Sequence, residues 1–400
     1  MRIAMISYWT CPLTRLGVLN AGGLNVYILN LANELGKLGH QVDIYTRAHK
    51  ERDESIVTIH QNVRIIHLAT RLLHHYQNVE SFGHRIIDFT SKQSLSYEII
   101  HSHYFYSGLV GLFLKEKLKI PHFVTFHTLA VMKDLYAGIS DSKRIEAEKK
   151  IIEGSDGIIA STELEKNDLL TGYKASPSKI FVIHPGVNHH IFKKYDRAYS
   201  RKKLHLSARQ KMILFVGRID PIKGISLLIE AIYKLTHTYP KFEDNYRVIL
   251  IGGDIESRSF WKHPEVVKIS RLIDKKKLDC CIKFIGSRPH NILPFYYSAS
   301  DVIVAPSSYE SFGLVVLEAM ACGGVVLASK VGGLKYLITD KDNGRLFESG
   351  NFKGLGSILW ELLNDKKQRL RLGQAAEDSS YKFCWDKQAN KTIDVYKKFL

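Results

Sequence analysis

Residues 310–329 are Glu-Ser-Phe-Gly-Leu-Val-Val-Leu-Glu-Ala-Met-Ala-Cys-Gly-Gly-Val-Val-Leu-Ala-Ser, a pattern that predicts a loop, a helix, a tight turn and a strand. The apolar run at 301–305 before this stretch predicts a buried parallel strand. Glu310 would then lie just past the carboxyl end of a strand, where open α/β sheets bind their ligands. The stretch therefore predicts an α/β fold with a ligand site near residues 310–318.

The start of the predicted helix suits an anion. Its free backbone N–H groups and its dipole favour negative charge, and they belong to Phe312, Gly313, Leu314 and Val315. Glu318 would lie inside the helix among apolar neighbours, where an unpaired carboxylate is costly. Either a nearby Arg or Lys pairs with Glu318, or Glu310 and Glu318 accept hydrogen bonds from sugar hydroxyls on either side of a bound phosphate.

The composition indicates a globular chain of two domains. Four hundred residues are too many for one ordinary core, and a hydrophobic content of 45% with a mean hydropathy of −0.11 suits a water-exposed protein. No apolar run approaches ~20 residues, and residues 2–8 predict a first strand instead of a signal peptide. The odd number of cysteines, without C-x-x-C spacing, predicts reduced thiols and a cytoplasmic protein.

The net charge of +17 suits anionic partners, such as nucleotide sugars, a phosphorylated acceptor or acidic lipid. The basic residues are spread in short runs, and the sequence shows no basic helix or aromatic-basic module of a nucleic-acid binder. We therefore expect no nucleic-acid partner, while a weak association with membrane surfaces stays open. The sequence does not indicate an oligomeric state.

Strand and helix patterns alternate along the chain and restart after a basic stretch at 193–206. This alternation predicts two Rossmann-like, doubly wound parallel sheets with a cleft between their carboxyl edges. We expect an N-terminal domain over 1–190 and a C-terminal domain over 191–384. Residues 70–95 predict a loop with a helix, and 385–400 a final helix. The expected strands are 2–8, 41–46, 63–68, 99–104, 122–128, 157–161, 179–184, 211–216, 247–251, 282–285, 301–305 and 325–328.

Two cations follow the first strand of the second half. In Gly-Arg-Ile-Asp-Pro-Ile-Lys-Gly at 217–224, Arg218 and Lys223 would point at one spot and suit a diphosphate. The alternative is a pair of solvated surface cations. We favour the diphosphate because the strand end and the two glutamates point to the same cleft.

Other candidate residues carry weaker signals. Gly22 and Gly23 end the first loop and open the first helix, where they would permit close approach of a phosphate. His101, His103 and His127 fall at strand ends, where most histidines are packed or solvated. The Asp-Lys-Asp sequence at 340–342 precedes Asn-Gly, which predicts a turn instead of a metal site. With no His/Cys ligand spacing either, we expect no essential metal and no cofactor.

The two glutamates, in their Glu-Ser-Phe-Gly-Leu context, resemble the donor-site signature of retaining GT-B glycosyltransferases of the family-4 type. Gly22 and Gly23, with Asn25 and Tyr27, resemble the inositol-phosphate N-acetylglucosaminyltransferases of mycothiol synthesis. Sucrose-phosphate synthases share the Gly-Gly position. The resemblance extends from Arg2 to Trp385.

This resemblance implies roles at the donor site. Glu310 would contact the transferred sugar, Glu318 the ribose diol, and Arg218 and Lys223 the leaving diphosphate. His127 would reach the sugar and stabilise its cationic transition state through its backbone carbonyl and hydrogen bonding. The segment that includes Ser287 and Arg288 would contact the base through its backbone. The implied catalytic set is therefore His127, Arg218, Lys223 and Glu310, and the final helix would cross back onto the first domain.

The resemblance also implies an acceptor site. Asn25, Tyr104, Thr128 and Arg144 match positions that hold the acceptor's phosphate. The family's acceptor-binding Lys, expected between residues 70 and 90, has no clear counterpart, and Arg71 or Arg85 would have to substitute for it.

Together these features predict retaining, metal-independent transfer of a glucose-type or N-acetylglucosamine-type sugar. The donor would be a nucleotide-diphosphate sugar with UDP as the expected carrier, and the acceptor a hydroxyl of a phosphorylated sugar or polyol. The absence of an obvious carboxylate on the far face of the sugar, together with the resemblance, favours front-face displacement. The alternatives are a sucrose-phosphate synthase-like activity, a lipid- or polysaccharide-directed transferase, and a nucleotide-sugar-binding module without catalysis.

Overall fold

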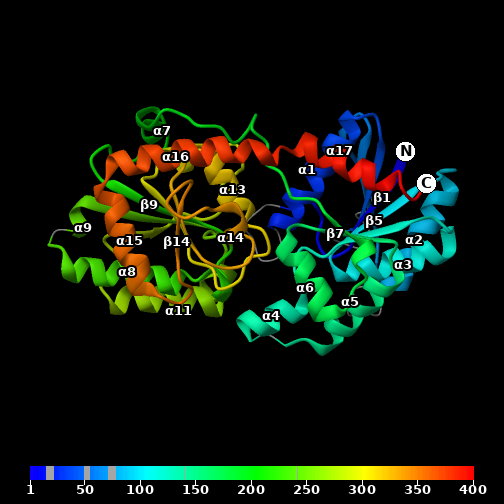
Figure 1. Ribbon diagram of the computed structural model, residues 1–400, viewed down its shortest axis with the longest axis horizontal. Helices are drawn as coiled ribbons and strands as arrows, with labels where there is room; N and C mark the ends of the chain where they lie inside the picture. The colour runs from blue at the N-terminus through cyan, green and yellow to red at the C-terminus, as the bar shows by residue number, and fades with distance from the viewer. Residues whose placement is uncertain (15–21, 49–54, 71–77, 139, 241) are drawn as a thin grey trace. The chain divides into compact units, whose positions relative to one another are not determined.

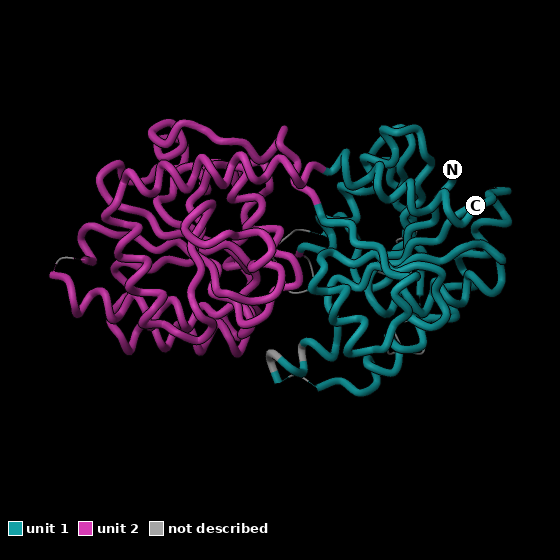
Figure 2. Tube along the Cα trace, in the orientation of Figure 1, with its two compact units in different colours: residues 1–14, 23–185, 385–400 teal, residues 15–22, 186–384 magenta. Residues whose placement is uncertain are grey.

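The chain divides into two compact units (Figure 2). The computed structural model describes residues 1–14, 22–48, 55–70, 78–138, 140–240 and 242–400. Unit 1 comprises residues 1–14, 23–185 and 385–400, and unit 2 comprises 15–22 and 186–384. The chain thus passes into unit 2 after Pro185 and returns to unit 1 at Trp385.

Unit 1 is built on a sheet whose described strands have the order β3-β4-β2-β1-β5-β6-β7-β8. All neighbouring pairs are parallel except β3–β4, which is antiparallel. The strands are β1 Arg2–Ser7, β2 Gln41–Arg47, β3 Ser55–His60, β4 Val63–Leu68, β5 Ile99–His103, β6 His122–Thr125, β7 Gly157–Ala160 and β8 Ile180–Val182.

Helices cover both faces of this sheet (Figure 1). α1 and α17 pack with Ile3 and Met5 on one face, whereas α2 and α3 pack with Ala4 and Ile6 on the other. The final helix, α17, lies against α1 and belongs to unit 1. The helices are α1 Gly23–Lys37, α2 Val79–Lys92, α3 Phe105–Leu118, α4 Ala130–Ala137, α5 Ser142–Gly154, α6 Glu163–Tyr173 and α17 Trp385–Tyr396.

Unit 2 contains a parallel sheet with the strand order β11-β10-β9-β12-β13-β14 in the described chain. One core joins α8, α11 and α15 to one face, and a second core joins α12 and α13 to the other. The strands are β9 Lys211–Val216, β10 Tyr246–Ile251, β11 Ile282–Phe284, β12 Val302–Ala305, β13 Val326–Ser329 and β14 Arg345–Phe347. The helices are α7 Arg197–Lys203, α8 Ile225–Thr238, α9 Phe242–Asn245, α10 Arg258–Lys262, α11 Pro264–Lys275, α12 Leu293–Ala299, α13 Leu314–Ala321, α14 Leu334–Leu337, α15 Phe352–Asn364 and α16 Lys366–Ser380.

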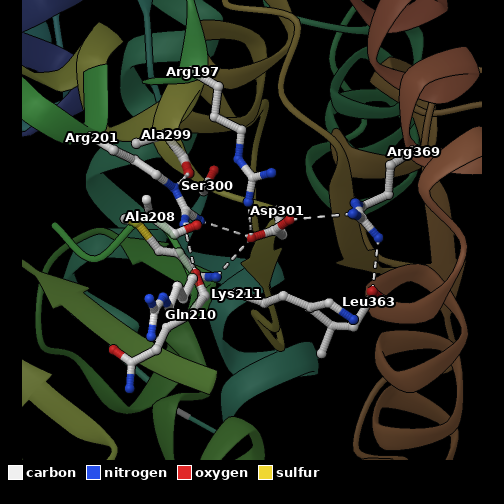
Figure 3. A network of polar contacts seen from close by, with 12 residues as sticks. Arg197, Arg201, Ala208, Gln210, Lys211, Ala299, Ser300, Asp301, Leu363 and Arg369 are labelled. Carbon is white, nitrogen blue, oxygen red and sulfur yellow. Dashed lines mark hydrogen bonds and ion pairs between the residues drawn. The ribbon is translucent and has the colours of Figure 1, made fainter. Parts of the chain in front are cut away.

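Asp301 ties helices to the amino edge of the unit 2 sheet (Figure 3). Its buried carboxylate accepts hydrogen bonds from Arg197 at 2.6 Å, Arg201 at 3.0 Å and the amide of Met212 at 2.8 Å. Arg369 of α16 lies 3.3 Å from the other carboxylate oxygen. A buried carboxylate is tolerated when it is paired and hydrogen-bonded in this way. This network holds α7 and α16 against the sheet.

The structure confirms the predicted fold class and corrects several details. β3 was not predicted, because this exposed edge strand lacks a regular apolar alternation. β14 was also missed, since it is only three residues long. The strand predicted over 122–128 ends at Thr125, because the backbone turns and His127 has φ +63°. No helix in the described part of the chain is both long and apolar enough to cross a membrane.

Candidate active site

The carboxyl edge of the unit 2 sheet brings Lys223 and Glu310 together. Lys223 Nζ donates a hydrogen bond of 2.6 Å to Glu310 Oε2, and both side chains are about one-fifth exposed. Gly224 makes this contact possible: its φ is +68°, and a Cβ there would lie 2.0 Å from the carbonyl oxygen of Pro306. Only glycine fits so close an approach. The segment after β9 is therefore pressed against the loop after β12.

Arg218 belongs to the same segment but is more exposed. Its Nη2 lies 3.7 Å from Asp220, whose carboxylate also accepts a hydrogen bond of 3.1 Å from the amide of Ile222. Asp220 thereby fixes the turn that leads to Lys223. Arg218 keeps 38% of its side chain exposed, so it can contact a ligand without losing a buried partner.

Helix α13 begins at Leu314, with Gly313 as its N-cap at φ +102°. A Cβ on Gly313 would lie 2.7 Å from Leu334, so α14 packs directly on the cap. Phe312, predicted to open the helix, instead precedes it and has its ring in the unit 2 core. Leu314 and Val315 are the first helical residues, as expected, and their amides are available to an anion at the helix start.

The turn Val331–Gly333 supports this loop and was not recognised from the sequence. The Gly333 amide donates 2.9 Å to the Glu310 carbonyl, and a Cβ on Gly333 would lie 2.3 Å from Phe312 Cα. Gly332 is equally tight against the backbone of Glu310. The signal was the Gly-Gly pair that follows strand β13.

Glu318 is a buried carboxyl without a strong cation partner. It accepts a hydrogen bond of 3.1 Å from Tyr297 Oη, and His290 Nε2 lies 3.8 Å away. Burial lowers the pKa of His290 to about 4 and raises the pKa of Glu318 to about 8. His290 is therefore neutral near pH 7. No Arg or Lys forms an ion pair with Glu318 within the described chain, which removes the first of the two alternatives stated for this residue.

The segments that follow β9, β10 and β11 meet near Ser287. The Ser287 amide donates 2.7 Å to the Gly253 carbonyl, and a Cβ on Gly252 would lie 1.9 Å from the Gly217 carbonyl. The Ser287 hydroxyl is buried and has no hydrogen-bond partner among the described residues. Arg288 is partly buried, and its Nη1 lies 3.3 Å from the Ser287 carbonyl.

In unit 1, His127 follows β6 and is partly buried. Its Nε2 lies 3.2 Å from His103 Nδ1, and its ring meets the Tyr27 ring edge-on at 4.9 Å. Burial lowers the pKa of His127 to about 3. The imidazole is therefore neutral at physiological pH, so any part it takes in binding is that of a neutral hydrogen-bonding group.

Arg144, Thr128 and Tyr104 form one cluster in unit 1. Arg144 Nη2 lies 3.0 Å from Thr128 Oγ1, and its guanidinium carbon is 4.8 Å from the centre of the Tyr104 ring. Arg144 Nε donates 2.7 Å to Glu148, which was not singled out from the sequence although it lies four residues further along α5. The described residues offer no partner to Arg144 Nη1.

The remaining predicted residues lie elsewhere in the fold. Asn25 is buried on α1 and donates 2.7 Å to the Cys11 carbonyl, which anchors the loop after β1. Gly22 precedes α1 and Gly23 is its first residue. Arg85 is on α2 and partly buried, whereas Arg71 is outside the described residues.

The acidic pair at 340–342 belongs to a turn. Asp340 accepts a hydrogen bond of 2.8 Å from the amide of Leu346 and lies 3.3 Å from Arg345 Nε. The carboxylate thus closes the turn before β14. Across the described ranges, no group of three or more His, Cys, Asp or Glu residues could hold a metal ion.

Two doubly wound sheets in one chain, with charged and polar side chains at their carboxyl strand ends, match the fold class of the GT-B glycosyltransferases. Comparison with known proteins agrees. The family model "Glycosyltransferase Family 4" matches residues 21–190, and "Glycosyl transferases group 1" matches residues 196–379.

The D-inositol 3-phosphate glycosyltransferase of Corynebacterium glutamicum is 35% identical over 409 residues, covering 99% of this chain and 96% of that protein. The sucrose-phosphate synthase of Thermosynechococcus elongatus has a TM-score of 0.90 at 29% identity, over 99% of this chain and 98% of that one. Anabaena HepE in complex with UDP-glucose, with a TM-score of 0.78 and 18% identity, covers 99% of this chain and 100% of its own and shares the fold. The chain belongs to the glycosyltransferase family that includes these D-inositol 3-phosphate glycosyltransferases, and the prediction that it is a glycosyltransferase is confirmed.

Proposed function

We propose that this glycosyltransferase moves a glucosyl or N-acetylglucosaminyl group, with retention, from a UDP-sugar to a hydroxyl of a phosphorylated polyol or sugar. The observation that carries the proposal is the Lys223–Glu310 contact at the carboxyl edge of the unit 2 sheet. One group suits a leaving diphosphate and the other a sugar hydroxyl, and they already touch. The name of the relatives at 33–35% identity supports the phosphorylated acceptor, and the HepE complex supports a UDP-sugar.

The donor half of the proposal concerns the negative charge of the leaving diphosphate. When the bond from the sugar to the diphosphate breaks, negative charge builds on the diphosphate, and Lys223 and Arg218 would stabilise it. Glu310 would then exchange its hydrogen bond from Lys223 for one from a hydroxyl of the transferred sugar. The amides of Gly313, Leu314 and Val315 would hold a phosphate at the start of α13.

Glu318 would bind the ribose. Among the described residues, its buried carboxyl has a Tyr hydroxyl and a neutral His beside it and no charged partner. A ribose diol would supply two hydroxyl donors, which stabilise the carboxylate and favour its ionised form. The buried Ser287 hydroxyl, without a partner in the described structure, and Arg288 would lie near the base.

The acceptor half rests on the cluster of Arg144, Thr128 and Tyr104. Arg144 Nη1 carries two N–H donors without partners in the described structure, and Thr128, which accepts from Arg144, has its own proton to donate. Glu148 offsets part of the charge of Arg144, so we expect moderate phosphate selectivity. Asn25 would act by holding the loop after β1.

In the proposed front-face reaction, the acceptor hydroxyl attacks the anomeric carbon from the side of the leaving group. The new glycosidic bond forms as the carbon–oxygen bond to the diphosphate breaks, and the hydroxyl proton passes to a diphosphate oxygen. The reaction needs no cofactor in this scheme. Since the described cysteines are all free thiols, we also propose a reducing, cytoplasmic setting.

The test is mass spectrometry of products from UDP-glucose and UDP-N-acetylglucosamine offered with inositol phosphates, hexose phosphates and their dephosphorylated forms. A phosphorylated glycoside as the main product supports the proposal. A preference for unphosphorylated acceptors would contradict its acceptor half. A sucrose-phosphate synthase-like activity is the second candidate, favoured by the TM-score of 0.90, and it would appear as a phosphorylated disaccharide made from a ketohexose phosphate.

A further inference from the structure

Three histidines of unit 1 lie in a row along β5 and just after β6, with their rings tilted against one another, and we call this row the histidine stack. The His101 and His103 rings are 4.2 Å apart between centroids, and those of His103 and His127 are 5.4 Å apart. His101 and His103 are fully buried. The stack leads from the sheet interior to His127, which is partly exposed.

His101 is fixed through both of its ring nitrogens. Its Nδ1 is 2.7 Å from the hydroxyl of Tyr396 on α17, and its Nε2 is 2.9 Å from Thr125 Oγ1. Because His103 packs between this fixed ring and the Tyr27 ring, its own orientation is determined by packing. The final helix therefore helps to position residues at the end of β6.

The hydrogen bond between His103 Nδ1 and His127 Nε2, 3.2 Å long, can have its proton on either nitrogen. A neutral imidazole has one N–H and one bare nitrogen. If His127 donated, the proton of His103 would sit on Nε2, which is buried and has no acceptor among the described residues. A buried N–H without an acceptor is the rarer and costlier defect. If His103 donates instead, its Nε2 carries a lone pair without a donor, which is the less costly of the two defects.

We propose that His103 is a positioning residue: its Nδ1–H donates to His127 Nε2 and thereby holds His127 as the Nδ1–H tautomer. Within the described chain the His127 ring makes its hydrogen bond through Nε2, and its Nδ1 has no partner there. The residue also has a left-handed φ of +63° that a non-glycine residue seldom adopts. The stack thus presents a neutral hydrogen-bond donor at the end of β6. This inference rests on the proposed function only in its last step, the contact between His127 and the transferred sugar.

The tautomer can be measured without substrate. In the full-length protein labelled with ¹⁵N-histidine, long-range ¹H–¹⁵N correlations show which ring nitrogen carries the proton, and the His127 signals are those lost in His127→Gln. We expect a protonated Nδ1 and a bare Nε2 in His127 of the wild type. A proton on His127 Nε2 would overturn the proposal, whatever the reaction proves to be.

A pair of variants tests the role of His103. His103→Leu removes the donor, whereas His103→Asn keeps an amide N–H near the position of Nδ1. We expect His103→Leu to mix the tautomers of His127 and to lower kcat about tenfold, the effect of one misplaced hydrogen bond, with donor KM nearly unchanged. His103→Asn should restore both the tautomer and most of kcat.

The outcomes separate this inference from the proposed function. An unchanged His127 tautomer in His103→Leu, in a variant whose thermal melt shows a folded protein, refutes the inference. A changed tautomer with normal kcat would refute its link to catalysis. If His103→Leu does not fold, the tautomer of His127 in the wild type and in His103→Asn still tests the inference. Failure of the proposed function would appear instead as absent sugar transfer by the wild type.

Discussion

Lys223 and Glu310 are 87 positions apart in the chain, yet they share a hydrogen bond of 2.6 Å at the carboxyl edge of one sheet. In the proposed reaction Lys223 exchanges this carboxylate for the leaving diphosphate. The same residue then stabilises negative charge on the leaving group that is larger in the transition state than in the bound donor. Its removal should therefore affect turnover more than donor binding.

We expect Lys223→Ala to lower kcat at saturating donor by about a hundredfold or more. Lys330→Ala is the matched control, because Lys330 also pairs with a glutamate of unit 2, at 3.3 Å, but on an exposed surface. This control should leave kcat unchanged. Near-normal turnover of Lys223→Ala would rule out its assignment to the diphosphate.

Glu318→Gln should raise the donor KM about tenfold while changing kcat by less than about threefold. The ribose changes little during the reaction, so its contacts contribute equally to the ground state and the transition state. Steady-state kinetics with varied donor give both constants. A loss confined to kcat would instead place Glu318 at the reacting sugar.

The same residue should make stability depend on pH. Burial raises the pKa of Glu318 from 4.5 to about 8, so the folded protein binds this proton more tightly than the unfolded chain does. Its contribution to stability is therefore fully present below about pH 4.5 and is lost as the pH rises through 8. We expect the fall in Tm of the ligand-free enzyme between pH 5 and pH 9 to be smaller in Glu318→Gln, as thermal melts can show. Parallel curves for wild type and variant would contradict the raised pKa.

Much of this arrangement was predictable from sequence, and the exceptions have physical reasons. The buried parallel strands were found because their apolar runs are continuous. The positions of Lys223 and Glu310 at strand ends followed from those strands. Their direct contact did not, since a sequence pattern fixes which edge a residue occupies but not what it touches.

The unit 1 site shows the same limit. The family resemblance implied that Arg144 is a phosphate ligand, but it did not reveal that Glu148 already accepts a hydrogen bond from Arg144 Nε. The histidine stack was equally hidden, because His101 and His103 looked like ordinary packed strand residues. Two features distinguish the stack: the left-handed backbone at His127, and the Nε2 of His103, which has no partner among the described residues. Neither can be read from sequence.

A test of the contact between Arg144 and the acceptor's phosphate has to take Glu148 into account, because the two side chains are paired. Replacing Arg144 alone would leave Glu148 buried with the Ala130 amide and the Tyr173 hydroxyl as its remaining partners in the described structure. Arg144→Ala should therefore cost roughly 3–5 kcal/mol of stability. The double variant Arg144→Ala/Glu148→Gln removes both charges and should recover much of this loss. It is therefore the proper variant for kinetics.

In that double variant we expect the KM of a phosphorylated acceptor to rise at least about tenfold, because the charge-assisted contact to phosphate is lost. The KM of the same acceptor without its phosphate should change less than about twofold, and Glu148→Gln alone serves as the control for the second substitution. Kinetics with the matched acceptor pair measure both effects. An equal rise for both acceptors would mean that Arg144 organises the fold of unit 1 without contacting phosphate. The assignments of Lys223, Glu310 and Glu318 would stand apart from that result because these residues lie in unit 2.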